Sequence, residues 1–155
     1  MEDEVNRLNK ISDSFHKLSK KVKLYSLLKK ADSEYQKCDY SSGRKTLQYT
    51  LTEFPNNVEA LRGLGCVEQF DGNLDEALEY FFKSSEYSDD KEVDYTLIAM
   101  VYYLKEDFDT ALKYFDMAIE YNEEYTSAYE GRNQAMLENH LKILDLQDAL
   151  EKFFK

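Results

Sequence analysis

The side chains that could bind a metal or act as a nucleophile are few and far apart in this sequence. Its two histidines, His16 and His140, have no second His or Cys at the spacing a zinc site needs. Its two cysteines, Cys38 and Cys66, are too few for a disulfide framework and are typical of a reducing compartment. No run of close glycines precedes a helix to form a phosphate-binding loop. The sequence therefore predicts no catalytic residue, no metal and no cofactor.

One acidic segment imitates a calcium loop. The letters DGNLDE, residues 71–76, match the first ligand positions of such a loop. The loop also needs Gly at its sixth place and Glu at its twelfth, and those places hold Glu76 and Phe82. We therefore interpret the segment as a turn between two helices.

Composition limits the partners. The 155 residues carry a net charge of −11, which excludes nucleic acid and an anionic membrane as partners of the whole surface. One Pro and five Gly favour long helices over a turn-rich β fold. The acidic start is unlike a signal peptide, and no apolar window of about 18 residues could span a membrane. These features predict a soluble, cytoplasmic protein.

The charge is unevenly distributed along the chain. Residues 1–30 carry eight Lys and Arg against four Asp and Glu, whereas residues 31–155 carry 12 against 27. A basic segment therefore precedes a strongly acidic body.

The sequence repeats itself after 34 residues. GNLDEALEYFFKSSEY, residues 72–87, aligns with EDFDTALKYFDMAIEY, residues 106–121. The identical pairs include Asp75/Asp109, Ala77/Ala111, Leu78/Leu112, Tyr80/Tyr114, Phe81/Phe115 and Tyr87/Tyr121. This period, with helical spacing inside each unit, indicates paired helices that stack on one another.

The pattern of small and aromatic residues resembles the tetratricopeptide repeat. Unit 58–91 carries it at Leu61, Leu64, Gly65, Ala77, Phe81 and Ser84, and unit 92–125 at Tyr95, Ile98, Ala99, Tyr102, Ala111, Phe115 and Ala118. A degenerate unit precedes them at 24–57. A modified repeat or capping helix follows at 126–155, where the pattern needs a four-residue insertion. The resemblance implies an all-α fold, an α-solenoid of about three to four helix pairs over residues 24–155.

Residues 1–23 form the other predicted segment, an N-terminal amphipathic helix. Its apolar seam runs on into the first repeat with heptad spacing, at Leu8, Ile11, Phe15, Leu18, Val22 and Tyr25. Three roles are open for this helix. It caps the first repeat, it forms a homodimer through the seam, or it lies on an anionic membrane; the acidic start and body oppose the last of these.

The resemblance also implies a binding groove on the concave side of the solenoid. The expected lining residues are Tyr35, Arg62, Cys66, Gln69, Phe70, Thr96, Leu97, Met100, Tyr103, Leu104, Gln134 and Leu137. The basic clamp with which some family members hold an acidic chaperone tail is absent, because Leu28, Asp32, Gly63, Val93 and Leu97 occupy its places.

The groove has strongly acidic surroundings, with five basic and 18 acidic residues in 58–125. It therefore suits a protein or peptide segment with apolar anchors and basic flanks. The basic N-terminal segment is itself such an occupant, within the chain or in a dimer, and the C-terminal helix is another.

These features predict a non-catalytic adaptor that binds a protein segment. Two alternatives remain. One is a dedicated secretion chaperone of the type III translocator class, which resembles this chain in length, repeat number and N-terminal helix. The other is a self-assembling scaffold.

Overall fold

The turn inside each helix pair has the same backbone conformation three times, at intervals of 34 residues. Cys38, Gly72 and Glu106 adopt positive φ angles of 59°, 82° and 57°. At the middle turn the amide of Gly72 donates to the carbonyl of Gln69 at 3.1 Å, and the next amide donates to the carbonyl of Glu68 at 2.8 Å. This hydrogen-bond pattern is the Schellman motif, which ends a helix by satisfying its last carbonyls. The sequence period is therefore also a period of backbone geometry.

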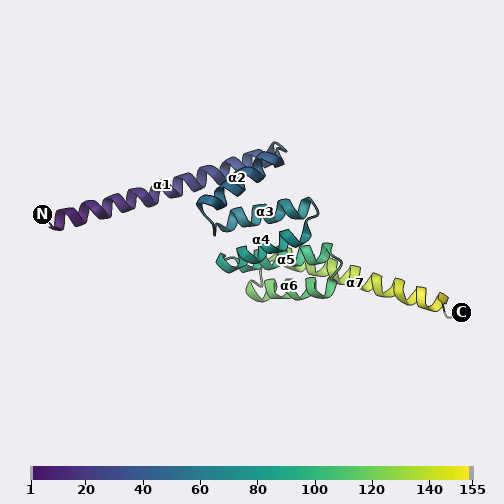
Figure 1. Cartoon of the computed structure of the whole chain (residues 1–155). Helices are drawn as coiled ribbons and strands as arrows, with labels where there is room; N and C mark the ends of the chain where they lie inside the picture. Colours follow the sequence, from purple (N-terminus) through teal and green to yellow (C-terminus); the bar gives the residue numbers. More distant parts are fainter. Residues whose placement is uncertain (1, 154–155) are drawn as a thin grey trace. The chain divides into compact units, whose positions relative to one another are not determined.

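The computed structural model describes residues 2–153, with side chains from residue 4 onward, so the outermost residues of the predicted segments 1–23 and 126–155 lie outside it. The described chain is all α-helical, with no strand (Figure 1). The helices are α1 (Glu2–Gln36), α2 (Tyr40–Glu53), α3 (Val58–Phe70), α4 (Leu74–Tyr87), α5 (Lys91–Leu104), α6 (Phe108–Tyr121) and α7 (Thr126–Phe153). They divide into two compact units, Met1–Ala60 and Leu61–Lys155, each described by itself below.

The second helix of each pair begins at an equivalent cap residue. Asp39, Asn73 and Asp107 precede α2, α4 and α6 at the same interval of 34. The carboxylates of Asp39 and Asp107 each accept a backbone hydrogen bond at 3.1 Å, from Ser42 and Thr110 respectively. Hydrogen bonds from the side chains of Ser42 and Thr110, and then from their backbone amides, lower the pKa of the two aspartates, because they stabilise the charged carboxylate.

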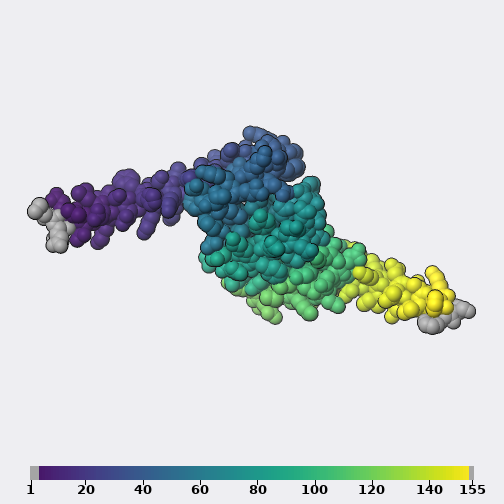
Figure 2. Space-filling model, viewed as in Figure 1, coloured from purple at the N-terminus to yellow at the C-terminus, as the bar shows by residue number. Residues whose placement is uncertain are grey.

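In the first unit, α1 packs against α2 through its C-terminal part alone. Ala31 of α1 and Leu47 of α2 are buried, and the Tyr35 ring lies against Gly43, where a Cβ would come within 2.9 Å of it. The N-terminal part of α1 continues as a single helix through residue 23, where the sequence placed a segment boundary (Figure 1). All side chains of residues 4–23 are exposed (Figure 2), so this part does not cap the first repeat.

The second unit is held together by rings that pack on small residues. Phe81 is 0% exposed and lies on Gly65, where a Cβ would stand 2.4 Å from the ring. Phe115 is equally enclosed and lies in the same way on Gly131 of α7. The predicted core alanines Ala77, Ala99 and Ala111 are fully buried. The sequence interpretation of the aromatics as core residues is confirmed at these positions.

Helix α7 is longer than the unit that it closes. Its first half packs beside α6 and α5, with Ala128 and Ala135 fully buried. From His140 to Phe153 every residue is exposed, and five leucines and isoleucines lie in that part. None of the described helices is long and apolar enough to cross a membrane.

The repeated turn gives a stability prediction at Gly72. No atom lies within 4 Å of a Cβ added there, so Gly72→Ala would be strained only by its φ of 82°. A left-handed non-glycine residue costs about 1 kcal/mol. We expect Gly72→Ala to lower the free energy of unfolding by about that amount in urea denaturation followed by circular dichroism. The matched change in the opposite direction, Cys38→Gly at the equivalent turn, should raise it. Equal stability of all three proteins would contradict this account.

Candidate functional site

An exposed apolar surface runs along two neighbouring helices of the second unit. Met100 and Leu104 lie one turn apart on α5 and are 42% and 49% exposed. Leu137 and Leu141 lie one turn apart on α7 and are 53% and 46% exposed. Because α5 and α7 pack side by side, we call these four residues the α5–α7 strip. Exposed apolar side chains gathered in this way are typical of an interaction surface.

A hollow of about 580 Å³ opens at one end of the strip. Its apolar part contains Leu104 and Leu141 together with the rings of Tyr103 and Phe108, whose centroids are 5.6 Å apart. Its polar part consists of Glu106, Glu138, Lys142 and Asp145. The hollow therefore combines an aromatic floor with a mostly acidic rim.

One cation already lies at this rim. The Lys142 ammonium is 3.0 Å from a carboxylate oxygen of Glu106 and 5.4 Å from the centre of the Phe108 ring. Glu138 accepts a hydrogen bond from Gln134 at 2.9 Å. With three carboxylates and one ammonium, the rim has a negative surplus and favours a cationic group in a ligand.

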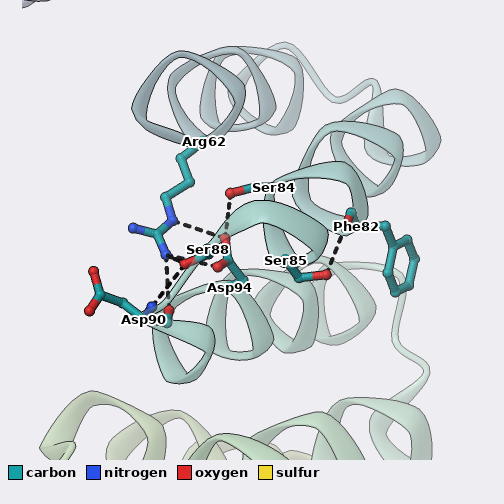
Figure 3. Close-up of polar contacts among 7 residues, drawn as sticks. All are labelled: Arg62, Phe82, Ser84, Ser85, Ser88, Asp90 and Asp94. Carbon is teal, nitrogen blue, oxygen red and sulfur yellow. Dashed lines mark hydrogen bonds and ion pairs between the residues drawn. The ribbon is translucent and has the colours of Figure 1, made fainter. Parts of the chain in front are cut away.

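The predicted groove residue Arg62 is engaged in a buried polar cluster (Figure 3). Its guanidinium donates two hydrogen bonds to the carboxylate of Asp94, at 2.9 and 2.8 Å, and others to the Ser88 hydroxyl and the Asp90 carbonyl. The hydroxyl of Ser84 donates to the same carboxylate at 2.6 Å. Asp94 and Ser84 are 0% exposed. This geometry ties Arg62 to the frame of the repeat.

The cluster occupies repeat positions that carry alanine elsewhere. Asp94 corresponds to Ala60 and Ala128, and all three are 0% exposed. Ser84 corresponds to Ala118, which is also fully buried. An acid at a position where other units hold alanine was the signal in the sequence that could have revealed this cluster.

The remaining predicted groove residues are not brought into one pocket. Tyr35 belongs to the first unit, where its ring lies between α1 and α2, 5.9 Å from Tyr40. Gln69 is half-buried and Phe70 exposed at the end of α3. Thr96 is buried, and no partner for its hydroxyl is found among the described residues. Leu97 packs against the core of α4 and α5.

Cys66 shows no sign of a reactive thiol. It is exposed on α3, but protein atoms around the sulfur raise its pKa, and the nearby Arg62 lowers it to a smaller extent. The thiol is therefore mainly protonated at neutral pH, whereas a nucleophilic cysteine needs a lowered pKa.

Sequence reasoning missed six of the eight residues that line the hollow. Tyr103 and Leu104 were among the predicted residues, whereas Phe108, Leu141 and the charged rim were not. The predicted strip on α7 stopped at Leu137, although Leu141 follows it after one helical turn. The rim residue Glu106 lies at the repeated turn between α5 and α6. The sequence period did not reveal that a residue of this turn lines the hollow.

Comparison with solved structures identifies the fold. The chain is similar to a Thermobaculum terrenum O-GlcNAc transferase mutant (19% identity, TM-score 0.69), with 76% of this chain aligned to 22% of that one. It is similar to the Yersinia enterocolitica type III secretion chaperone SycD in complex with a peptide of the translocator YopD (18% identity, TM-score 0.67, 75% of this chain and 94% of that one). It is also similar to the tetratricopeptide domain of Aspergillus fumigatus Sgt2 (12% identity, TM-score 0.69, 76% and 80%).

The chain is thus an all-α solenoid with the tetratricopeptide fold, as the repeat pattern predicted. It spans about a fifth of the length of the transferase that it matches, 22%. No family model and no curated protein matches the sequence.

The polar cluster gives a prediction about stability. In Asp94→Ala, Arg62 and the hydroxyl of Ser84 lose their shared acceptor, and we expect a loss of about 3 kcal/mol in the free energy of unfolding. The triple variant Arg62→Thr, Ser84→Ala and Asp94→Ala places at each position a residue found at an equivalent position of another repeat, and it should recover most of the loss.

Thermal and urea denaturation of both variants measure the effect. A triple variant as unstable as Asp94→Ala would show that the carboxylate stabilises the fold by a route other than this cluster.

Proposed function

We propose that the protein is a non-catalytic adaptor that binds a segment of another protein on the α5–α7 strip. The observation that carries this proposal is the hollow at the end of the strip, where four apolar side chains and a negative rim meet. Tetratricopeptide structures similar to this chain include SycD with a translocator peptide, which supports peptide binding as the use of this fold here.

The chemistry of the hollow defines the segment. Leu104, Leu141 and the two rings accept an apolar anchor, and the carboxylates of Glu138 and Asp145 attract a neighbouring Lys or Arg. The preferred ligand is therefore a segment with apolar anchors and basic flanks.

Two features favour a second, narrower function. SycD is a type III secretion chaperone, and the likeness covers 94% of its chain. The α1 seam is exposed, which leaves it accessible for the homodimer contact that the sequence predicts. A dedicated secretion chaperone is therefore the alternative to a general adaptor. A self-assembling scaffold remains a third possibility, in which the seam contact is itself the function.

Selection from a displayed library of random peptides tests the binding function. We expect the wild-type chain to enrich peptides with apolar residues beside Lys or Arg, and Met100→Glu to weaken their binding by about tenfold or more, because it places a charge in the apolar contact. Fluorescence anisotropy with the selected peptides measures the loss.

The control variant is Met117→Glu on α6, where the methionine is 40% exposed but lies outside the strip. It should bind as the wild type does, and circular dichroism should show equal helicity in all three proteins. Peptides that bind Met100→Glu and the wild type equally would reject the strip as the binding surface.

A further inference from the structure

We propose that the strip of one copy receives the N-terminal part of α1 from a second copy. The docking segment is residues 4–25, called here the α1 stretch, and its receptor is the α5–α7 strip with its hollow. This inference rests on the proposed function, since it names the segment with apolar anchors and basic flanks that the strip binds.

The α1 stretch is a helical segment with an exposed apolar face. Leu8, Ile11, Phe15, Leu18, Val22 and Tyr25 are 51% to 68% exposed, although all six lie on one side of a continuous helix. A shallow hollow of about 350 Å³, lined by Ile11, Phe15 and Leu18, follows this face. Figure 2 shows the side chains of this part of α1, in purple, at the surface on the viewed face. An apolar seam of this length needs a partner.

Charge selects the partner. The α1 stretch holds six basic and two acidic residues, and one of the six, Lys23, is paired with Glu53 of α2 at 2.6 Å. The stretch is therefore still positive, whereas the rim of the hollow holds three carboxylates and one ammonium. The acidic surplus of residues 58–125, with 18 acidic against five basic residues, surrounds the strip with the same sign. Docking of the stretch on the strip therefore brings opposite charges together and steers the encounter.

Pairing of two seams with each other has no such support. In a parallel pair, the positions beside the seam carry Arg7, Ser14 and Lys21 on one side, and they face Ser12, Ser19 and Ser26 on the other. These neighbours form no ion pair between two copies, and each copy adds the same positive surplus. The strip of another copy is thus the better complement to the seam.

Phe15 is the anchor that we assign to the hollow. It is 68% exposed, the largest value on the seam, and the cation beside the seam that lies nearest to it on the C-terminal side is Lys21. The aromatic floor of Tyr103 and Phe108 suits the ring of Phe15, and the carboxylates of Glu138 and Asp145 suit the ammonium group of Lys21.

Complementation between two variants of the full chain tests this assignment. We expect the wild type to associate, as its mass in analytical ultracentrifugation rises with concentration above 18.3 kDa. Phe15→Asp alone and Leu141→Asp alone should stay monomeric. A mixture of the two should associate again, because one variant supplies an intact strip and the other an intact α1 stretch. Met117→Asp, an exposed site outside both surfaces, should associate as the wild type does.

Seam-to-seam pairing gives the opposite pattern. Leu141→Asp alone would then associate, because its seam is intact. Mixing it with Phe15→Asp would not increase the association. Either that result or a monomeric wild type at all concentrations would overturn the inference.

Charge reversal at the rim gives a second test that does not touch apolar packing. Glu138→Lys with Asp145→Lys should weaken association by about tenfold, and adding Arg7→Glu with Lys21→Glu, the two cations beside the seam, to the same chain should restore it. Raising the salt concentration should weaken the wild-type assembly. Reversal at the rim without any effect would exclude the hollow as the receptor.

A synthetic peptide of residues 4–25 separates this inference from the proposed function. It should bind the Phe15→Asp chain, whose strip is intact, and should not bind that chain when Leu141→Asp is added. If this peptide does not bind while library peptides still bind the strip, the second copy is excluded as partner and the adaptor function stands. If neither binds, both proposals fail.

Discussion

Close contact between a phenyl ring and a glycine determines how near the helices of the second unit lie. Phe81 covers Gly65 and Phe115 covers Gly131, and at both glycines a Cβ would stand 2.4 Å from the ring. The ring fills the space that a side chain on the glycine would need. The two helices therefore lie close together, and the ring atoms occupy the space between them. The core alanines continue the same contact along each helix. These contacts occupy the buried faces of the helices. The α5–α7 strip therefore lies on the exposed faces of α5 and α7.

The buried polar cluster shows how one repeat departs from the others without changing the fold. A carboxylate of 0% exposure costs much free energy unless it is paired and hydrogen-bonded. Here Arg62 supplies two hydrogen bonds and Ser84 a third, so the oxygens of Asp94 are satisfied where alanine stands in other units. The exchange commits Arg62 to a structural role, and because it pairs one cation with one buried carboxylate, the net charge of the remaining surface is unchanged.

Sequence reasoning predicted what depends on periodicity and missed what depends on side-chain direction. The 34-residue period gave the fold, the turns and the buried rings, because each of these follows from spacing within a repeat. The hollow depends on Phe108 and on residues of α7 beyond the last repeat position, so the period did not identify it. Arg62 was placed in the groove by its register, yet its guanidinium contacts Asp94, 32 residues away. The repeat register gives the position of a residue on its helix, whereas the groups that contact its side chain determine the direction of that side chain.

The N-terminal part of α1 and the C-terminal part of α7 are both helices whose apolar residues are exposed. An isolated helix of about 20 residues is marginally stable in water, since most helical stability in proteins comes from packing of an amphipathic face. The α1 stretch packs against nothing along its seam, and α7 is exposed from His140 to Phe153. A partner that covers either face would stabilise the helix as well as bury its apolar residues, so binding and helix formation are coupled there. This coupling favours a partner that presents a fixed receptor surface. The part of the strip on α5 has that property, because Met100 and Leu104 lie on a helix that packs against α4, α6 and α7.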